Sequence, residues 1–179
     1  RLPPIQRVSG RFDLEDELVQ RVPPTRLICY HRFMSLAPLA VAEPWDLVAE
    51  SYAAEITPFF ESFARAALDD VGVHPGSRIA DVATGPGTLA LLGAARGAVV
   101  SALDFAPAMV QKLRQRAAAA GLAVEAVQGD GQALPWRDAS FDAAFSMFGL
   151  MFFPDRAAGF AQLHRVVRVG GVGAVTSWV

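Results

Sequence analysis

A glycine-rich segment near the middle of the chain constrains the fold more than any other feature. Residues 79–83 are apolar apart from Asp81 and predict a short buried strand, and a helix is expected to open at about Thr88. Gly85 and Gly87 lie between the two. Because glycine lacks a Cβ, such a turn can adopt unusual dihedral angles and expose bare backbone to a ligand. The free N–H groups at the start of the helix favour a bound carboxylate or phosphate.

Short apolar segments alternate with helical patterns from this turn to the end of the chain. Strands are expected at 79–83, 98–103, 124–128, 141–147 and 172–178, and helices at 88–95, 106–120 and 156–168. Two further helices are expected before them, one through Trp45 and Tyr52 and one from Pro58. This alternation predicts an α/β fold with a doubly wound, mostly parallel sheet and helices on both faces.

Composition narrows the possible partners. The 179 residues carry a net charge of −2 and no long basic run, so nucleic acid is not an expected partner. No apolar run reaches the roughly 18 residues of a membrane span. The single Cys29 excludes an internal disulfide framework and a thiolate-rich zinc site, and no metal is expected. No signal peptide is recognisable, which favours a cytoplasmic location. The oligomeric state is left open.

Two regions differ in their patterning. Residues 1–44 are interrupted by prolines and form a poorly patterned arm, with one possible short helix at 13–21 and no chemical motif. His31, in this arm, is interpreted as an ordinary histidine. Residues 45–179 form the expected ligand-binding domain.

Three acidic residues follow successive strands. Asp81 lies in the first strand, Asp104 ends the second and Asp130 follows the third. The carboxyl ends of parallel strands meet at one edge of the sheet, where such folds bind ligands. Asp104 suits the two hydroxyls of a ribose, Asp130 suits an exocyclic amine, and Asp81 suits an ammonium group. Each acid alone is also compatible with a helix cap or a turn, but together they indicate an adenosine joined to an amine and a carboxylate.

From about Trp45 onward, the sequence resembles class I S-adenosylmethionine-dependent methyltransferases of the methyltransferase type 11 and quinone-biosynthesis-like group. The matching segments, in chain order, are 81–87, 103–109, 129–135 with 140–142, 148–155 and 164–171. The resemblance implies the Rossmann-like methyltransferase fold, S-adenosylmethionine as cofactor, and methyl transfer to an oxygen, nitrogen or carbon nucleophile of a small molecule.

The resemblance also implies a set of cofactor-binding residues: Asp81, Ala83, Gly85, Gly87, Asp104, Phe105, Met109, Asp130, Gly131 and Met147. In this set Asp104 would hold the ribose, Asp130 and Gly131 would meet the adenine, and Phe105 or Met109 would pack on its ring. Met147 would offer backbone near the sulfonium. Pro86 replaces the hydroxyl residue of many relatives and removes a backbone donor. No catalytic base is assigned; His164 is expected in a helix away from the strand ends.

Relatives in this group continue past the fifth strand with two more strands. This sequence stops at Val179, where the fifth strand ends, so the C-terminal strands are expected to be missing, the domain truncated and one edge of the sheet uncovered.

Two alternative functions remain open from the sequence. A nicotinamide-dependent Rossmann oxidoreductase shares the glycine turn and Asp104, but it does not explain acids at Asp81 and Asp130. A non-catalytic S-adenosylmethionine-binding remnant would explain missing strands. Four aromatic residues also have two interpretations: Phe148, Phe152 and Phe153 either pack in the core or line an apolar acceptor pocket, and Tyr52 either packs or closes over a ligand.

Overall fold

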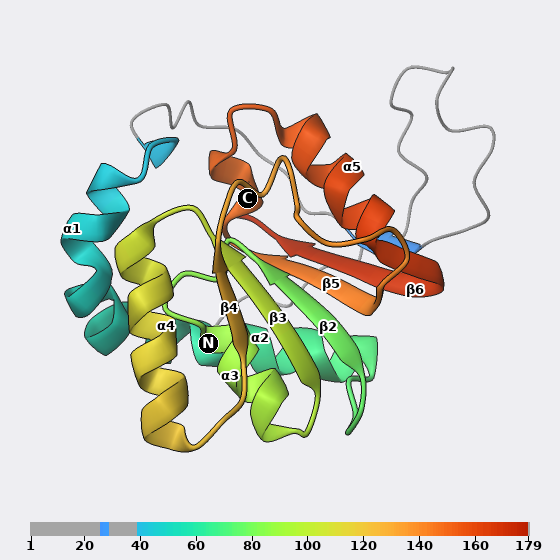
Figure 1. Cartoon of the computed structure of the whole chain (residues 1–179), viewed down its shortest axis with the longest axis horizontal. Helices are drawn as coiled ribbons and strands as arrows, with labels where there is room; N and C mark the ends of the chain where they lie inside the picture. The colour runs from blue at the N-terminus through green and yellow to red at the C-terminus, as the bar shows by residue number, and fades with distance from the viewer. Residues whose placement is uncertain (1–25, 29–38, 179) are drawn as a thin grey trace.

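The computed structural model describes residues 26–28 and 39–178, which form a six-stranded, fully parallel sheet in the order β1-β6-β5-β2-β3-β4 (Figure 1). The strands are β1 (Arg26–Ile28), β2 (Arg78–Val82), β3 (Val99–Asp104), β4 (Glu125–Gln128), β5 (Phe141–Met147) and β6 (Val167–Thr176). The possible helix at 13–21, Cys29 and His31 lie outside the described residues.

The helices are α1 (Glu43–Ser51), η2 (Tyr52–Ile56), α2 (Thr57–Val71), α3 (Thr88–Ala95), α4 (Pro107–Ala120), η3 (Leu150–Phe152) and α5 (Arg156–Val166). They confirm the α/β alternation expected from residue 79 onward. The expected helix at 88–95 and strand at 141–147 have the observed bounds. The expected strands at 79–83 and 98–103 are each shifted by one residue at both ends, and the helix at 106–120 and the strand at 124–128 begin one residue later than expected.

Helices cover both faces of the sheet, as expected for a doubly wound fold. Alternate side chains of β2 point to opposite faces: Ile79 belongs to the core cluster that contains Leu68 of α2 and Leu113 of α4, whereas Ala80 belongs to the cluster that contains Leu163 of α5. In Figure 1, α2 and α3 lie on one side of the sheet and α5 on the other. The central strand is therefore buried on both faces, which explains its nearly continuous apolar sequence.

The last strand differs from its expected form. The sequence predicts a turn at Gly170-Gly171 followed by a strand from Val172, but β6 begins at Val167 directly after α5. The two glycines lie inside the strand, in a bulge where the pairing with β5 jumps from Phe141↔Val167 to Ala143↔Val172. A Cβ on Gly171 would lie 2.6 Å from the backbone oxygen of Asp142, so the bulge requires glycine there.

Part of the outer edge of β6 is covered by another strand. Arg26, Leu27 and Ile28 of β1 pair in parallel with Val172, Gly173 and Ala174. The expectation of an uncovered edge is therefore wrong for these three residues. Because β1 is a short segment between prolines, its own sequence gives no period-2 pattern, and only the exposed backbone of β6 explains its conformation.

The helical segment before the sheet contains a π-helical turn. The backbone N–H of Thr57 bonds to the carbonyl of Tyr52, five residues earlier, and η2 joins α1 to α2 without leaving helical dihedral angles. The sequence predicts two helices here, whereas the structure has one helical path with an irregular turn. Turns of this kind are rare and are often found at functional sites.

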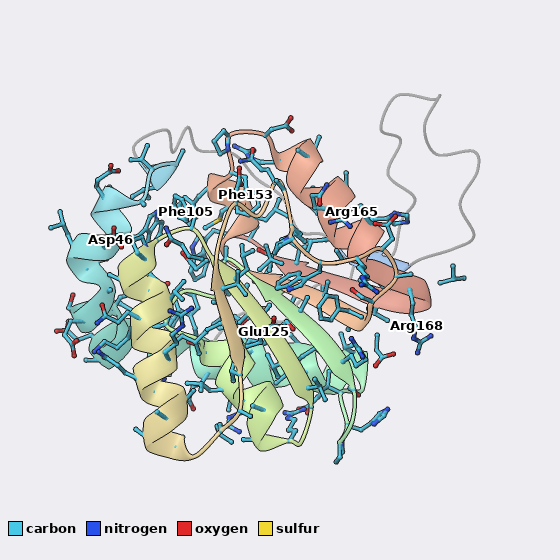
Figure 2. The ribbon with its side chains drawn as sticks, in the orientation of Figure 1. Asp46, Phe105, Glu125, Phe153, Arg165 and Arg168 are labelled. Carbon is cyan, nitrogen blue, oxygen red and sulfur yellow. The ribbon has the colours of Figure 1, made fainter. Side chains whose placement is uncertain are left out.

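Arg165 of α5 holds the loop that follows β4 (Figure 2). Its guanidinium donates to the carbonyl oxygens of Leu134 and Trp136 at 2.9 and 2.7 Å, and to Asp138 Oδ1 at 2.7 Å. It also bonds to Gln162 Oε1, which in turn accepts from the backbone N–H of Leu134. One planar fork therefore fixes several backbone positions of this loop.

Across residues 26–28 and 39–178, no helix has the length and hydrophobicity that crossing a bilayer requires.

Replacing Arg165 with Lys should lower the free energy of unfolding by about 1–3 kcal/mol, because one ammonium group cannot bond to all of these acceptors and leaves partly buried carbonyls without donors. Urea denaturation measures the change. Arg137→Lys, at an exposed position of the same loop, is the matched control and should change stability by less than about 0.5 kcal/mol. Equal stability of the two variants would contradict this role of Arg165.

Candidate functional site

A cavity of about 390 Å³ lies at the carboxyl ends of the strands, the position at which open α/β sheets bind ligands. Nine of the ten residues predicted to bind the cofactor line it: Asp81, Ala83, Gly85, Asp104, Phe105, Met109, Asp130, Gly131 and Met147. The structure thus brings together residues from the ends of four strands and from α4. Their contacts with a cofactor remain a prediction.

Asp81 fixes the glycine turn through hydrogen bonds. Its Oδ2 accepts hydrogen bonds from the hydroxyl of Thr84 at 2.6 Å and from the backbone N–H of Ala90, in α3, at 3.1 Å. The side chain is 1% exposed, and its other oxygen, Oδ1, has no hydrogen-bond partner among the described residues. A buried carboxylate oxygen without a donor is costly, so this atom favours a positively charged or hydrogen-bonding ligand group.

Asp104 connects the ends of β2 and β3. Its Oδ2 accepts from the backbone N–H of Gly85 at 2.7 Å, and its Oδ1 accepts from the N–H of Ala106 at 3.0 Å. Each oxygen can accept a second hydrogen bond, because a carboxylate oxygen has two lone pairs. The side chain is therefore held rigidly and retains an acceptor on each oxygen for a pair of ligand hydroxyls.

Burial determines the protonation of these two acids. It raises the pKa of Asp81 to about 7, an effect that the bonds from Thr84 and Ala90 partly offset and that the charge of Asp104 increases. Burial likewise raises the pKa of Asp104 to about 6, against the hydrogen bonds from backbone N–H groups. Burial, followed by the charge of Asp104, also raises the pKa of Tyr52. The cavity therefore favours a ligand that carries positive charge.

The backbone at the ends of the two central strands is strained. Ala83, after β2, has φ +56°, and Phe148, after β5, has φ +58°. Left-handed dihedral angles cost a residue with a Cβ about 1–2 kcal/mol. Both residues line the cavity, and a Cβ on Gly149 would collide with the Cβ of Ala83. The two turns therefore pack against each other. Their backbone strain lies at the cavity, which is where strained residues are commonly found in functional sites.

Gly85 and Gly87 have different roles in the turn. Gly85 has φ +56°, and a Cβ placed on it would meet no atom within 4 Å, so its backbone faces open space in the cavity. Gly87 does not line the cavity. It has φ +86°, and a Cβ there would collide with Leu113 of α4, so this glycine permits the close packing of two helices. Its contact with a cofactor stays a prediction.

The loop after β4 supplies the third acid. Asp130 is exposed, and its Oδ1 accepts from the backbone N–H of Gln132 at 2.8 Å. Gln132 in turn accepts from the N–H of Asp155, which links this loop to the start of α5. A Cβ on Gly131 would lie 2.6 Å from Phe153 Cε2 and 3.0 Å from Val82 Cγ1, so only glycine fits between these side chains.

Sequence reasoning missed part of the cavity wall. Four lining residues were not predicted as site residues: Trp45, Phe60, Thr84 and Gln132. For four others the sequence did not decide between the core and a ligand pocket, and all four line the cavity: Tyr52, Phe148, Phe152 and Phe153. Thr84 could have been predicted, because it lies within the predicted turn next to Gly85. The aromatic residues of the helices repeat at core spacing, so the sequence has no signal that separates wall from core.

The lining residues also limit the chemistry. None of the described residues that line the cavity is His, Cys, Lys or Arg. His164 is exposed on α5 and lies outside the cavity, as expected. Pro86 offers its carbonyl to Arg116 Nη1 at 2.7 Å instead of a side-chain hydroxyl to the ligand. The site can orient a cationic nucleoside through its carboxylates.

Comparisons with known proteins show the family to which the chain belongs. Residues 79–171 match the family model described as "Methyltransferase domain". An uncharacterised protein of Mycobacterium tuberculosis is 39% identical over 134 residues, which cover 75% of this chain and 46% of that protein. The demethylmenaquinone methyltransferase of Deinococcus radiodurans is 39% identical over 109 residues, covering 60% and 45%. The chain spans about half the length of these relatives.

Among solved structures, a putative S-adenosyl-L-methionine-dependent methyltransferase from Methanococcus maripaludis superposes with a TM-score of 0.64 at 23% identity, covering 83% of this chain and 67% of that one. At this identity the similarity concerns the fold alone. The matched segment contains the glycine turn and all three cavity acids. The match therefore favours a methyltransferase over the nicotinamide-dependent oxidoreductase that the glycine turn also allowed. The chain belongs to the methyltransferase domain family and has the Rossmann-like fold of S-adenosylmethionine-dependent methyltransferases.

Proposed function

We propose that the chain binds S-adenosylmethionine in this cavity and that the protein to which it belongs transfers the methyl group to a small molecule. One observation carries the proposal. Asp81 and Asp104 are both buried at the edge of the cavity, and the described lining residues supply no positive charge to compensate them. A ligand with an ammonium group, a sulfonium and a ribose provides the missing partners.

The residues fit the parts of this cofactor. Asp81 Oδ1, buried and without a partner, would accept from the ammonium group. Asp104 retains one acceptor on each oxygen for the two ribose hydroxyls. Gly85 offers open backbone to the methionine part, and Phe105 and Met109 offer apolar surface to the adenine.

The cofactor supplies an activated methyl group, so the protein mainly has to align the reactants and exclude water. The strained turns at Ala83 and Phe148 line the cavity, as does Met147 at the end of β5. Aromatic side chains on the remaining wall exclude water. We assign no catalytic base, because the acids of the cavity are expected to be occupied by the cofactor.

Calorimetric titration tests the cofactor. S-adenosylmethionine should bind, NAD should not, and Asp104→Ala should weaken binding by about 100-fold or more, because it removes hydrogen bonds to a charged group. Asp69→Ala, which removes a surface carboxylate on α2, is the matched control and should bind normally. Thermal melting shows whether each variant is folded.

Binding of NAD, or equal affinity of both variants for S-adenosylmethionine, would overturn the proposal. Tight cofactor binding without turnover on any acceptor of a broad panel would favour the non-catalytic alternative.

The affinity for S-adenosylmethionine should rise between pH 5 and 7.5. The raised pKa values of Asp81 (about 7) and Asp104 (about 6) mean that both acids are largely protonated at pH 5 in the free protein. A cationic ligand binds the ionised forms, so binding releases protons and strengthens as the pH rises. At pH 6, roughly 1.4 protons per cofactor should be released, measurable by calorimetry in buffers of different ionisation enthalpy.

Asp81→Asn is the control for this pH dependence. It keeps an acceptor for Thr84 and Ala90 but does not titrate, so it should release fewer protons and show a flatter pH profile. An affinity that falls as the pH rises in this range, or the same proton release from both proteins, would contradict the assignment.

A further inference from the structure

The side-chain amide of Gln132 connects two parts of the cavity wall. Its Oε1 accepts a hydrogen bond from the backbone N–H of Asp155 at 2.8 Å, and its Nε2 donates to Asp130 Oδ1 at 3.0 Å and to Asp130 Oδ2 at 3.3 Å. Gln132 and Asp130 line the cavity, and Asp155 follows directly after the lining residue Pro154. One side chain therefore bridges the loop after β4 and the segment that leads into α5.

Both neighbours require the same orientation of this amide. A backbone N–H can only donate, so the oxygen of Gln132 must face Asp155, and an ionised carboxylate can only accept, so the nitrogen must face Asp130. Asp155 is itself held in place as the N-cap of α5, where its Oδ1 accepts from the backbone N–H of Ala158 at 2.9 Å. A flip of the amide would therefore lose the hydrogen bonds on both sides.

The amide gives the two oxygens of Asp130 different environments. Oδ1 accepts from the backbone N–H of Gln132 at 2.8 Å and from its side chain, and these two bonds use both lone pairs of that oxygen. Among the described residues, Oδ2 accepts only the longer bond of 3.3 Å from Gln132. Oδ2 is thus the oxygen that can accept from a ligand while the bonds to Oδ1 persist.

The position of Asp130 makes such support valuable. Asp130 is exposed on a loop, and an exposed side chain without a partner loses conformational entropy when a ligand orders it. Gln132 orders the carboxylate before the ligand arrives, so this cost is not taken from the binding free energy.

We propose that Gln132 is a positioning residue that directs Oδ2 of Asp130 toward the exocyclic amine of the adenine. The site would then discriminate between a 6-amino and a 6-oxo purine, because a carbonyl oxygen at that place would face an acceptor and leave both without a donor. Gln132 acts through Asp130 and does not itself contact the base. The proposal rests on the proposed function, because the adenine belongs to the cofactor of the same cavity.

Binding of two matched ligands measures this discrimination. S-adenosylhomocysteine and S-inosylhomocysteine differ at purine position 6, which carries an amine in the first and a carbonyl oxygen in the second. Calorimetric titration of each at pH 7.5 gives an affinity ratio. The unchanged protein should prefer the adenosyl ligand by about 10- to 100-fold, the effect of one hydrogen bond to a charged group. Equal affinities for the two ligands would overturn the proposal.

Substitutions of Gln132 test whether its amide produces the ratio. Gln132→Met nearly keeps the size of the side chain but removes the amide, and it should reduce the ratio about 3- to 10-fold, because the adenosyl ligand must then order Asp130 itself. Gln132→Ala should reduce the ratio to a similar extent, since the amide rather than the volume matters. Thermal melting shows that each variant is folded.

Gln115→Met, at an exposed position of α4 outside the cavity lining, is the matched control and should keep the ratio of the unchanged protein. A merely structural role of Gln132 would weaken the binding of both ligands equally. An unchanged ratio in Gln132→Met and Gln132→Ala would therefore contradict the proposal.

A double-mutant cycle shows whether Gln132 acts through Asp130. Asp130→Ala removes the carboxylate and should bring the affinity ratio close to 1. Adding Gln132→Met to that variant should change the ratio by less than about 2-fold, because the group that Gln132 positions is already gone. A larger change would show that Gln132 reads the base independently of Asp130, and it would overturn the positioning role.

The same titrations separate this inference from the proposed function. Binding of the adenosyl ligand with a ratio that does not respond to Gln132 overturns the inference alone. If the unchanged protein binds neither ligand, the proposed function fails, and the inference that rests on it fails as well.

Discussion

Two buried carboxylates, Asp81 and Asp104, bind the backbone that carries the site, and the arrangement of the cavity follows from them. Asp81 joins the glycine turn to the first helical turn of α3, and Asp104 joins that turn to the start of α4. Both are removed from water, which raises the pKa of each well above its ordinary value. Backbone N–H groups and one hydroxyl stabilise them only in part, so the folded protein carries a local excess of negative charge that a cationic ligand would relieve.

The polar and apolar parts of the cavity come from different layers of the fold. The strand ends supply the acids and the bare backbone, while the helical path through α1, η2 and α2 supplies rings. Asp46 (labelled in Figure 2) joins α1 to α4, because its Oδ1 accepts a hydrogen bond from the backbone N–H of Ala108 at 2.8 Å. Lys112 of α4 pairs with Glu50 of α1. The wall that contains these rings is thus attached to the same helix that begins beside Asp104.

Prediction from the sequence succeeded where the signal was local. The β2–α3 turn and the strand ends that carry Asp104 and Asp130 follow from short apolar segments and glycines, and they supply nearly all of the predicted lining. It failed where two distant segments determine a conformation together. Gly170-Gly171 has the composition of a turn, but pairing with β5 makes it a bulge, and β1 is a strand only because β6 offers it an edge.

The sequence by itself determined the order of strands and helices, the parallel sheet and the three acids at its carboxyl edge, because hydrophobic period and glycine placement act over a few residues. Only the tertiary structure decided which oxygen of Asp81 lacks a partner, that Gly87 packs against a helix rather than lining the cavity, and that rings from α1, α2 and the segment after β5 form one wall. These features depend on contacts between residues far apart in the chain. Such contacts are fixed by the packing of whole elements and leave no local pattern to read.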